Sequence, residues 1–365
     1  MNRNAPAMRR WQRLCSFGRR PALRLFALLA IALAWVAPGQ AVGGGRSVTD
    51  SAGRHVELPD TVKRVFAAGP PAAVLIYTLA PDKLVGWPRK LAPEAADYIP
   101  VEYAALPVVG RLTGHENAAG VAAVLAAHPD IIVDVGDVEP EYVELAERVQ
   151  KESGIPYVLI DGSLAKTADS YRALGEILGE PARAAELAGY ADGLLSDVQG
   201  KLASAGPVRA YIGRGKDGLE TALAGSINAE ALAVAGAVNV AAAAGSGELT
   251  KVTVAQVGAW NPDVIIALDP AFFAAATTDP QWRALGAVAA HRVLLAPAAP
   301  FGWIDSPPSA NRLIGVRWLA ARLHPEAFPG DLRDMARDFY ARFYHRAPSE
   351  TQLDALLHVA TQASP

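Results

Sequence analysis

Two aromatic residues and an acid stand close together in a proline-rich part of the chain. Residues 301–305 read FGWID and follow an apolar run at 293–295 that is typical of a strand. In open α/β sheets ligands bind where strands end, so this segment is a predicted binding loop. Phe301 and Trp303 would offer apolar surface to a flat ligand, and Asp305 would offer a carboxylate. The alternative is that the two rings only cover the lobe as a hydrophobic plug.

Cationic side chains follow expected strands in the first half of the chain. A short strand is predicted at 83–86 (KLVG), Trp87, Pro88 and Arg89 follow it, and Arg111 follows the run VVG. A planar guanidinium group suits carboxylate, hydroxamate or other oxyanion groups of a ligand. We therefore expect these residues to face a ligand together with the aromatic loop.

A glycine-rich segment in the second half offers another cation. Residues 212–218 read IGRGKDG, which contains the spacing G-x-G-x-x-G after an apolar run. A dinucleotide-binding fingerprint also needs a helix opening at the third glycine, but residues 219–226 (LETALAGS) favour a loop or strand. We expect the glycines to let backbone N–H groups and Arg214 approach an anionic ligand, with Lys251 contributing from the same half.

Metal and hydrolase chemistry find little support in the residue pattern. The 7 histidines are scattered without a tight ligand pair, and His115 beside Glu116 comes nearest to one. Ser163, Ser226 and Ser309 lack the G-x-S-x-G setting of a hydrolase nucleophile. We therefore predict neither a bound metal ion held by the protein nor a catalytic site.

Strands that alternate with helices must position the predicted site residues. A hairpin is expected at 47–59. Further strands are expected at 64–68, 131–135, 157–160, 208–212, 264–268 and 293–295. Helices are expected at 70–79, 118–127, 141–153, 167–178, 229–235, 253–259, 310–322, 331–344 and 349–360. The alternation predicts parallel sheets covered on both faces. The aromatic residues of FYARFY (339–344) are expected to pack in the core.

One long helical pattern at 181–203 separates two similar halves. Apolar residues recur along it at three- and four-residue steps, which gives one apolar stripe. The segments VAAVLAAHPDIIVDV and VAQVGAWNPDVIIAL flank it, and each predicts a helix, a Pro-Asp pair and a buried strand. We therefore predict an α/β fold of two Rossmann-like lobes with parallel sheets joined by one long helix. The expected domains are an N-terminal lobe at 47–179, the connecting helix at 180–204, a C-terminal lobe at 207–325 and C-terminal helices at 326–365.

The first residues of the chain have the plan of an export signal. Residues 1–24 contain seven arginines and no acid, and an apolar run at 25–37 is too short to span a bilayer. A signal peptide is predicted at 1–41, with a signal anchor as the alternative. Cys15 lies before the apolar run, so the exported chain would have no thiol. The net charge of -3 gives no case for nucleic acid. A bacterial periplasm is the expected location.

The order of these segments resembles the periplasmic binding proteins of ABC importers for iron chelates and cobalamin. The resemblance is carried by TDSAGRHVELPDTVKRV, the pair AHPDIIV and AWNPDVII, the long helix, APFGWIDSPPSANRLIGVRWLA and HPEAFPGDLRDMARDFYARFY. It implies a monomer that holds its ligand between two lobes, closes only modestly, and works with an ABC permease and its ATPase. The family usually carries a docking glutamate seven residues before each Pro-Asp. Here those positions are Ala122 and Ala255, and Glu116 or Glu248 is the candidate substitute.

The sequence thus predicts a periplasmic solute-binding protein, not an enzyme, which captures a ferric siderophore or similar iron chelate and has no cofactor. The predicted ligand-binding residues are Trp87, Arg89, Arg111, Arg214, Lys251, Phe301, Trp303 and Asp305. Alternative cargoes on the same fold are cobalamin, haem and molybdate or tungstate. The alternative of a different class is an exported two-domain α/β enzyme.

Overall fold

An antiparallel hairpin opens the part of the chain that the computed structural model describes, residues 46–113 and 120–358. It consists of β1 (Arg46–Thr49) and β2 (His55–Leu58), as predicted for 47–59. The Asp50 carboxylate closes the turn by accepting from the Ala52 and Arg54 N–H groups, both at 3.0 Å. It also accepts from the Leu159 N–H at 3.2 Å, so the same side chain docks the hairpin onto the first sheet. The predicted signal peptide at 1–41 lies outside the described residues.

The first sheet contains three parallel strands, β3 (Val65–Ala67), β4 (Ile131–Gly136) and β5 (Tyr157–Asp161), in the order β3-β4-β5. Its helices are α1 (Pro70–Leu79), α4 (Val121–Ala127), α5 (Pro140–Ser153) and α6 (Thr167–Leu178). Alternate residues of β4 face opposite clusters: Ile131 and Val133 pack with α1 and α6, and Ile132 packs with α4 and α5. Both faces are covered, which explains why β4 is apolar along most of its length.

The second sheet contains four parallel strands in the order β11-β10-β6-β8. They are β6 (Val208–Gly213), β8 (Ala237–Asn239), β10 (Val264–Ala267) and β11 (Val293–Leu295). Its helices are α8 (Glu230–Val234), α9 (Val254–Trp260), α10 (Pro270–Thr278), α11 (Pro280–Arg283), α12 (Gly286–Ala289) and α13 (Asn311–Leu323). A separate antiparallel pair joins β7 (Glu220–Ala222) to β9 (Leu249–Lys251). We call the elements around the first sheet the first lobe and those around the second sheet the second lobe.

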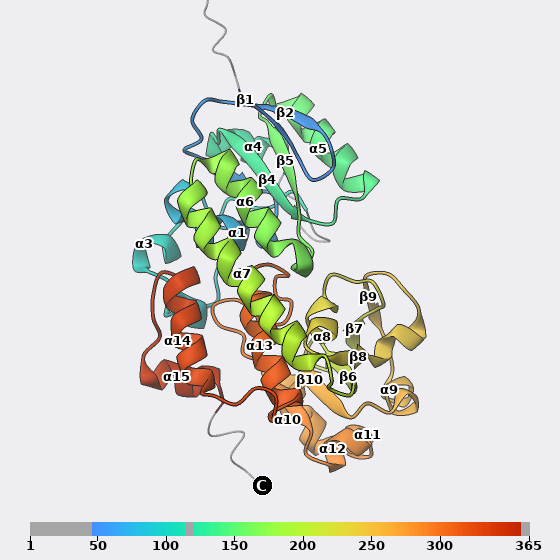
Figure 1. Cartoon of the computed structure of the whole chain (residues 1–365). Helices are drawn as coiled ribbons and strands as arrows, with labels where there is room; N and C mark the ends of the chain where they lie inside the picture. Colours follow the sequence, from blue (N-terminus) through green and yellow to red (C-terminus); the bar gives the residue numbers. More distant parts are fainter. Residues whose placement is uncertain (1–45, 114–119, 359–365) are drawn as a thin grey trace, which may run out of the picture. The chain divides into compact units, whose positions relative to one another are not determined.

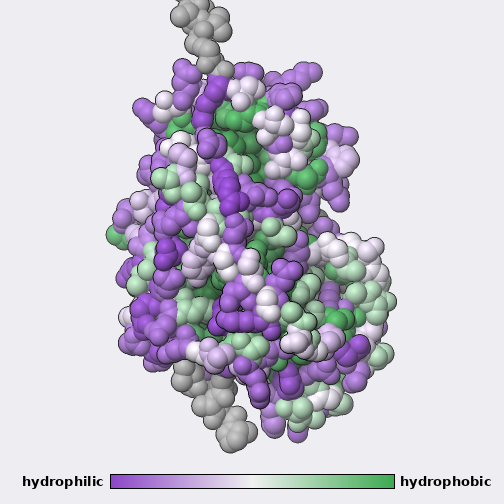
Figure 2. Space-filling view, in the orientation of Figure 1, coloured by the Kyte–Doolittle hydropathy of each residue, from purple (hydrophilic) through white to green (hydrophobic). Residues whose placement is uncertain are grey.

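The predicted connecting helix is α7 (Pro181–Leu202), which packs against α6, α13 and α8 (Figure 1). Its buried residues are Ala184, Leu187, Ala188, Ala191 and Val198, all on one face. Hydrophilic side chains cover most of the surface that Figure 2 shows. The burial of one face of α7 follows from the apolar stripe in its sequence. No helix among the described residues has both the length and the hydropathy needed to cross a bilayer.

The repeated Pro-Asp pairs hold the same position in both lobes. The Asp130 carboxylate accepts from the Arg64 N–H at 2.8 Å, and the Asp263 carboxylate accepts from the Arg209 N–H at 2.9 Å. Both guanidinium groups then donate to the last carbonyls of the neighbouring helix, α4 in the first lobe and α9 in the second. Carbonyls at a helix end lack partners within the helix, so these arginines satisfy them. The duplication seen in the sequence is therefore a duplicated set of contacts.

Two sequence-based assignments need correction. The strand expected at 83–86 is wrong, because Pro81 begins a short 3₁₀ helix (Pro81–Lys83) and only Leu84 pairs with Val65 in an isolated bridge. The helices α10, α11 and α12 were not expected at all. Asp269 and Asp279 cap the first two of them, and a proline follows each cap. This Asp-Pro pattern is a helix-start signal that the sequence did contain.

The C-terminal helices α14 (Leu332–Phe343) and α15 (Glu350–Leu356) pack against first-lobe residues. Tyr77 of α1 donates its hydroxyl hydrogen to the Tyr344 carbonyl at 2.6 Å, and Tyr98 donates to the Gln352 carbonyl at 3.2 Å. The aromatic residues of 339–344 are buried, as predicted. Residues 43–365 form one unit in their contacts, so the predicted domain limits within them stay predictions.

A buried carboxyl group lies in the centre of the first sheet. Asp134 of β4 is 5% exposed and accepts hydrogen bonds from the Tyr157 hydroxyl and the Val135 N–H, both at 3.0 Å. Burial raises the pKa of Asp134 from 3.8 to about 6, and the hydrogen bonds from Tyr157, Val135 and Thr113 oppose the rise. Ionisation of this group therefore opposes folding.

The free energy of unfolding of Asp134→Asn, relative to that of the wild type, should be higher at pH 7.5 than at pH 4. Between 3.8 and about 6 the folded state binds the proton more tightly than the unfolded state, so wild-type stability falls as pH rises through this range. A difference of roughly two pKa units corresponds to about 3 kcal/mol. Urea unfolding of both proteins at both pH values measures the effect. An equal stability difference at the two pH values would contradict it.

Candidate functional site

A cavity of about 430 Å³ lies where the two lobes meet. The first lobe contributes the start of α1 and residues 87–92 with Glu94, and the second lobe contributes Leu268 and most of the segment 296–307. These segments follow β3, β10 and β11, so the cavity lies at the carboxyl ends of strands from both sheets. This is the location at which α/β folds bind ligands. We call residues 296–307 the cavity loop.

Five of the predicted ligand residues line this cavity: Trp87, Arg89, Phe301, Trp303 and Asp305. Three predicted residues do not belong to the lining. Arg111 lies near enough to Arg89 for its charge to lower the pKa of that residue. Arg214 lies behind the wall in contact with Asp305, and Lys251 is an exposed residue of β9. A place in a cavity lining does not test ligand binding, so the binding roles of all eight residues stay predictions.

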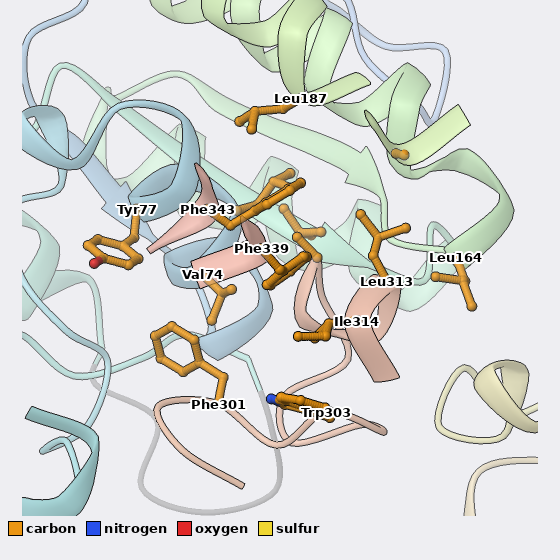
Figure 3. Close-up of a cluster of buried hydrophobic side chains, with 14 of the residues drawn as sticks. Val74, Tyr77, Leu164, Leu187, Phe301, Trp303, Leu313, Ile314, Phe339 and Phe343 are labelled. Carbon is orange, nitrogen blue, oxygen red and sulfur yellow. The ribbon is translucent and has the colours of Figure 1, made fainter. Parts of the chain in front are cut away.

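The aromatic wall joins the two lobes. The rings of Trp87 and Phe301, one from each lobe, have centroids 5.9 Å apart, and both rings are at least 90% buried. Trp303 has no exposed surface and forms the back of the wall, facing the cluster of buried side chains in Figure 3. The indole N–H of Trp87 donates to the Tyr103 carbonyl at 2.8 Å, and that of Trp303 donates to the Tyr340 hydroxyl at 3.1 Å. The two indole rings of the cavity wall are therefore already fixed by protein contacts.

Arg214 and Asp305, both predicted to contact ligand, form an ion pair with each other. Arg214 also contacts the Glu220 carboxylate at 3.1 Å. Burial raises the pKa of Asp305, and the Arg214 charge opposes that rise. Burial lowers the pKa of Arg214, but Asp305 and Glu220 outweigh this effect and the net pKa is raised. The guanidinium group stays charged, and its charge neutralises the buried acid of the cavity wall.

The glycine-rich segment serves packing in this structure. Gly213 and Gly218 lie against the ring of Phe272, and a Cβ atom at either position would lie 2.2 Å from a ring carbon. Gly218 also has a φ of +69°, in the left-handed region that favours glycine. The strand β7 follows the last glycine, where a dinucleotide fingerprint would require a helix. The expected approach of these backbone N–H groups to an anion is untested.

The exposed charge of the lining is cationic on the first-lobe side. Arg89 and Lys90 are exposed, and neither has a carboxylate partner among residues 46–113 and 120–358. Desolvation and, second, the nearby charge of Arg111 lower the pKa of Arg89. Glu94 is the one other acid of the lining besides the paired Asp305. The sequence analysis missed Lys90, although it directly follows a predicted residue.

A buried arginine holds the lobes together beside the cavity. Arg312 of α13 is 1% exposed and donates to the Gly162 carbonyl of the first lobe and to the Glu230 carboxylate of the second, the latter at 2.6 Å. The same Glu230 oxygen accepts from the Leu164 N–H at 2.8 Å. Burial lowers the pKa of Arg312, and the Glu230 charge opposes this. The sequence analysis missed this contact, since its only signal was a cation within an apolar helical pattern.

The sequence analysis predicted no metal ion held by the protein and named candidate residues for permease docking. No group of three His, Cys, Asp or Glu side chains that could hold a metal ion occurs in the described part of the chain. His115 and Glu116 lie outside it. Ala122 and Ala255 are exposed on α4 and α9, and Glu248 is exposed before β9. No contact tests the docking role of these positions.

Comparisons with known proteins agree with this fold. Residues 75–300 match the family described as periplasmic binding protein. An ABC transporter solute-binding protein from Sulfurospirillum deleyianum has 26% identity and a TM-score of 0.78, covering 86% of this chain and 99% of its own. A periplasmic solute-binding protein from Veillonella parvula has 24% identity and a TM-score of 0.69, with 88% and 99% covered. The molybdate periplasmic binding protein of Haemophilus influenzae, solved with molybdate, has 23% identity and a TM-score of 0.69, with 83% and 99% covered. Comparison with curated proteins gives no match.

Replacing Arg214 by Met should destabilise the fold strongly, because Asp305 would keep a buried charge without its partner. Removing one member of a buried pair typically costs about 3–5 kcal/mol. The double variant R214M/D305N should recover most of that loss. Urea unfolding of both variants is compared with that of R172M. Arg172 is exposed and pairs with Asp192 on the surface, so R172M should change stability much less. Equal losses for R214M and R172M would contradict the assignment.

Proposed function

The chain belongs to the periplasmic binding protein family, and from this premise we propose that it captures a ferric siderophore or a similar anionic iron chelate. The cargo would bind in the cavity between the lobes and pass to an ABC permease, whose ATPase supplies the energy. In this proposal binding and release are the whole function, without a chemical step on the cargo. The family implies the periplasm as the location, and a cleaved signal peptide at 1–41 is the proposed route of export.

The charge distribution of the cavity is the observation that carries this proposal. The buried acid of the wall, Asp305, is already neutralised by Arg214, while Arg89 and Lys90 face the cavity without a described carboxylate partner. Unpaired cations at the edge of a partly apolar cavity favour an anionic ligand. Carboxylate, catecholate and hydroxamate groups of an iron chelate would supply that charge.

The size and apolar content of the cavity favour an organic cargo. Small-molecule pockets of roughly 300–1,000 Å³ suit drug-sized ligands, and this one measures about 430 Å³. Much of its wall is proline, aliphatic and aromatic side chain, including Trp87 and Phe301. An organic shell around a metal ion would cover these surfaces, whereas a small oxyanion would leave most of them without contact.

Molybdate is the second candidate cargo, because the Haemophilus influenzae protein of similar fold is a molybdate-binding protein. A tetrahedral oxyanion requires several convergent donors. The available side-chain donors here are Arg89 and Lys90 on one wall, because the hydroxyl of Ser306 on the other already donates to the Asp305 carboxylate at 3.2 Å. Cobalamin or haem, in contrast, would depend more on the apolar wall than on the cations.

Binding measurements on the exported chain test the proposal. Isothermal titration calorimetry would use ferric citrate, a ferric trihydroxamate, a ferric tricatecholate, their iron-free forms, haemin, cobalamin and molybdate. We expect one ferric chelate to bind with a sub-micromolar Kd and its iron-free form to bind much more weakly. A response to molybdate, cobalamin or haemin alone would contradict the siderophore assignment and keep the family.

A pair of variants tests the role of the cations. Arg89→Gln should weaken binding of the ferric chelate about 10- to 100-fold, the range expected when a hydrogen bond to a charged group is lost. Arg292→Gln is the matched control, because Arg292 is exposed, precedes β11 and does not line the cavity. The control should bind like the wild type. Equal affinities for both variants would contradict the proposed role of Arg89.

A further inference from the structure

We propose that Tyr340, on the C-terminal helix α14, is a positioning residue of the binding cavity. It would act by holding the cavity loop in the shape that completes the second-lobe wall. The inference rests on the proposed use of this cavity as the cargo site. Tyr340 does not line the cavity, so its effect on a ligand would pass through the loop.

The cavity loop has few regular contacts of its own. It forms no helix or strand, and its internal backbone bonds include Trp303 N–H to the Pro297 carbonyl at 2.9 Å and Gly302 N–H to the Ser306 carbonyl at 2.7 Å. Asn311 anchors its far end by donating to the carbonyls of Gly302 and Pro307. A segment with so little backbone pairing depends on side-chain contacts for a single conformation.

Tyr340 supplies two such contacts from one hydroxyl group. Its oxygen accepts from the indole N–H of Trp303 at 3.1 Å, and its hydrogen is donated to the carbonyl of Ala299. A phenol has one proton and accepting lone pairs, so both kinds of capacity are used. The two partners lie on the cavity loop four positions apart, on either side of Phe301. The side chain is fully buried, which makes loss of either bond costly.

Tyr344, four residues later at the C-terminal cap of α14, provides an internal comparison. Its ring packs against Phe301 with centroids 5.5 Å apart, and it is also fully buried. Its hydroxyl group, however, has no hydrogen-bond partner in the described part of the chain. The two tyrosines therefore share full burial and aromatic contact with the cavity loop, and they differ in hydrogen bonding.

The comparison predicts separate consequences for loss of the two hydroxyl groups. Without the Tyr340 hydroxyl the loop would sample further conformations, and a ligand would have to select the competent one, which lowers the apparent affinity. Without the Tyr344 hydroxyl nothing that touches the loop is lost. The variants Tyr340→Phe and Tyr344→Phe each remove one oxygen atom and keep the ring, so both are expected to fold.

The test combines hydrogen exchange with affinity. Exchange measured by mass spectrometry on peptides covering residues 299–306 should be at least about 10-fold faster in Y340F, because the protection of these amides depends on local opening. It should be unchanged in Y344F. The Kd for the ferric chelate that binds the wild type should rise about 5- to 20-fold in Y340F, the range for one or two lost hydrogen bonds. Y344F should keep the wild-type value.

The outcomes separate this inference from the proposed function. Wild-type protein that binds none of the tested cargoes would refute the proposed function, and with it a role of Tyr340 in cargo binding. Y340F with wild-type exchange in 299–306 would overturn the loop assignment whatever the cargo. In a third outcome Y340F has a lowered Tm and faster exchange, but its Kd is unchanged at a temperature where it is fully folded. Tyr340 would then be merely structural, and this would also overturn the inference.

Discussion

One buried guanidinium group links the two lobes beside the cavity. Arg312 donates to Gly162 in the first lobe and to Glu230 in the second, and Glu230 in turn accepts from Leu164. Moving a charged group from water into the protein interior costs roughly several kcal/mol. The charge is tolerated there only because its hydrogen bonds are satisfied. Hydrogen bonds are directional, so this network limits the angle between the lobes more narrowly than apolar contact would. We infer that it limits lobe closure.

The cavity follows from this constraint. With the lobes held at this angle, Trp87 and Phe301 touch across the boundary, and the wall is complete without a ligand. A preformed wall saves the ordering cost that a ligand would otherwise meet on binding. The helix α14 contributes to this wall as well, since Tyr340 holds the part of it that the sheets do not reach.

Local patterns in the sequence predicted most of the fold and the position of the site. The strand at 293–295 and the helix at 167–178 have the predicted limits. In the helix this is because its apolar periodicity agrees with its burial. Five of the eight predicted residues line one cavity. The strand-end rule placed Phe301, Trp303 and Asp305 there after β11, whereas Trp87 and Arg89 reach it although the strand predicted before them is absent. Residues 83–86 failed because an apolar run of that length fits a strand or a turn equally, and Pro81 decided between them.

The sequence could not predict which cations pair with acids inside the protein, and the reason is physical. Arg89 and Arg214 are the same residue type, and each follows an apolar run, so the sequence gives them equal standing. Their difference is made by Asp305, which is far from both in sequence and lies against Arg214 alone. Four cations were predicted to contact a ligand. Of these, Arg214 pairs with Asp305 behind the cavity wall, and Lys251 lies on β9 away from the lining. The charge offered to a cargo is therefore set by tertiary pairing, and it is concentrated on the first-lobe side of the cavity.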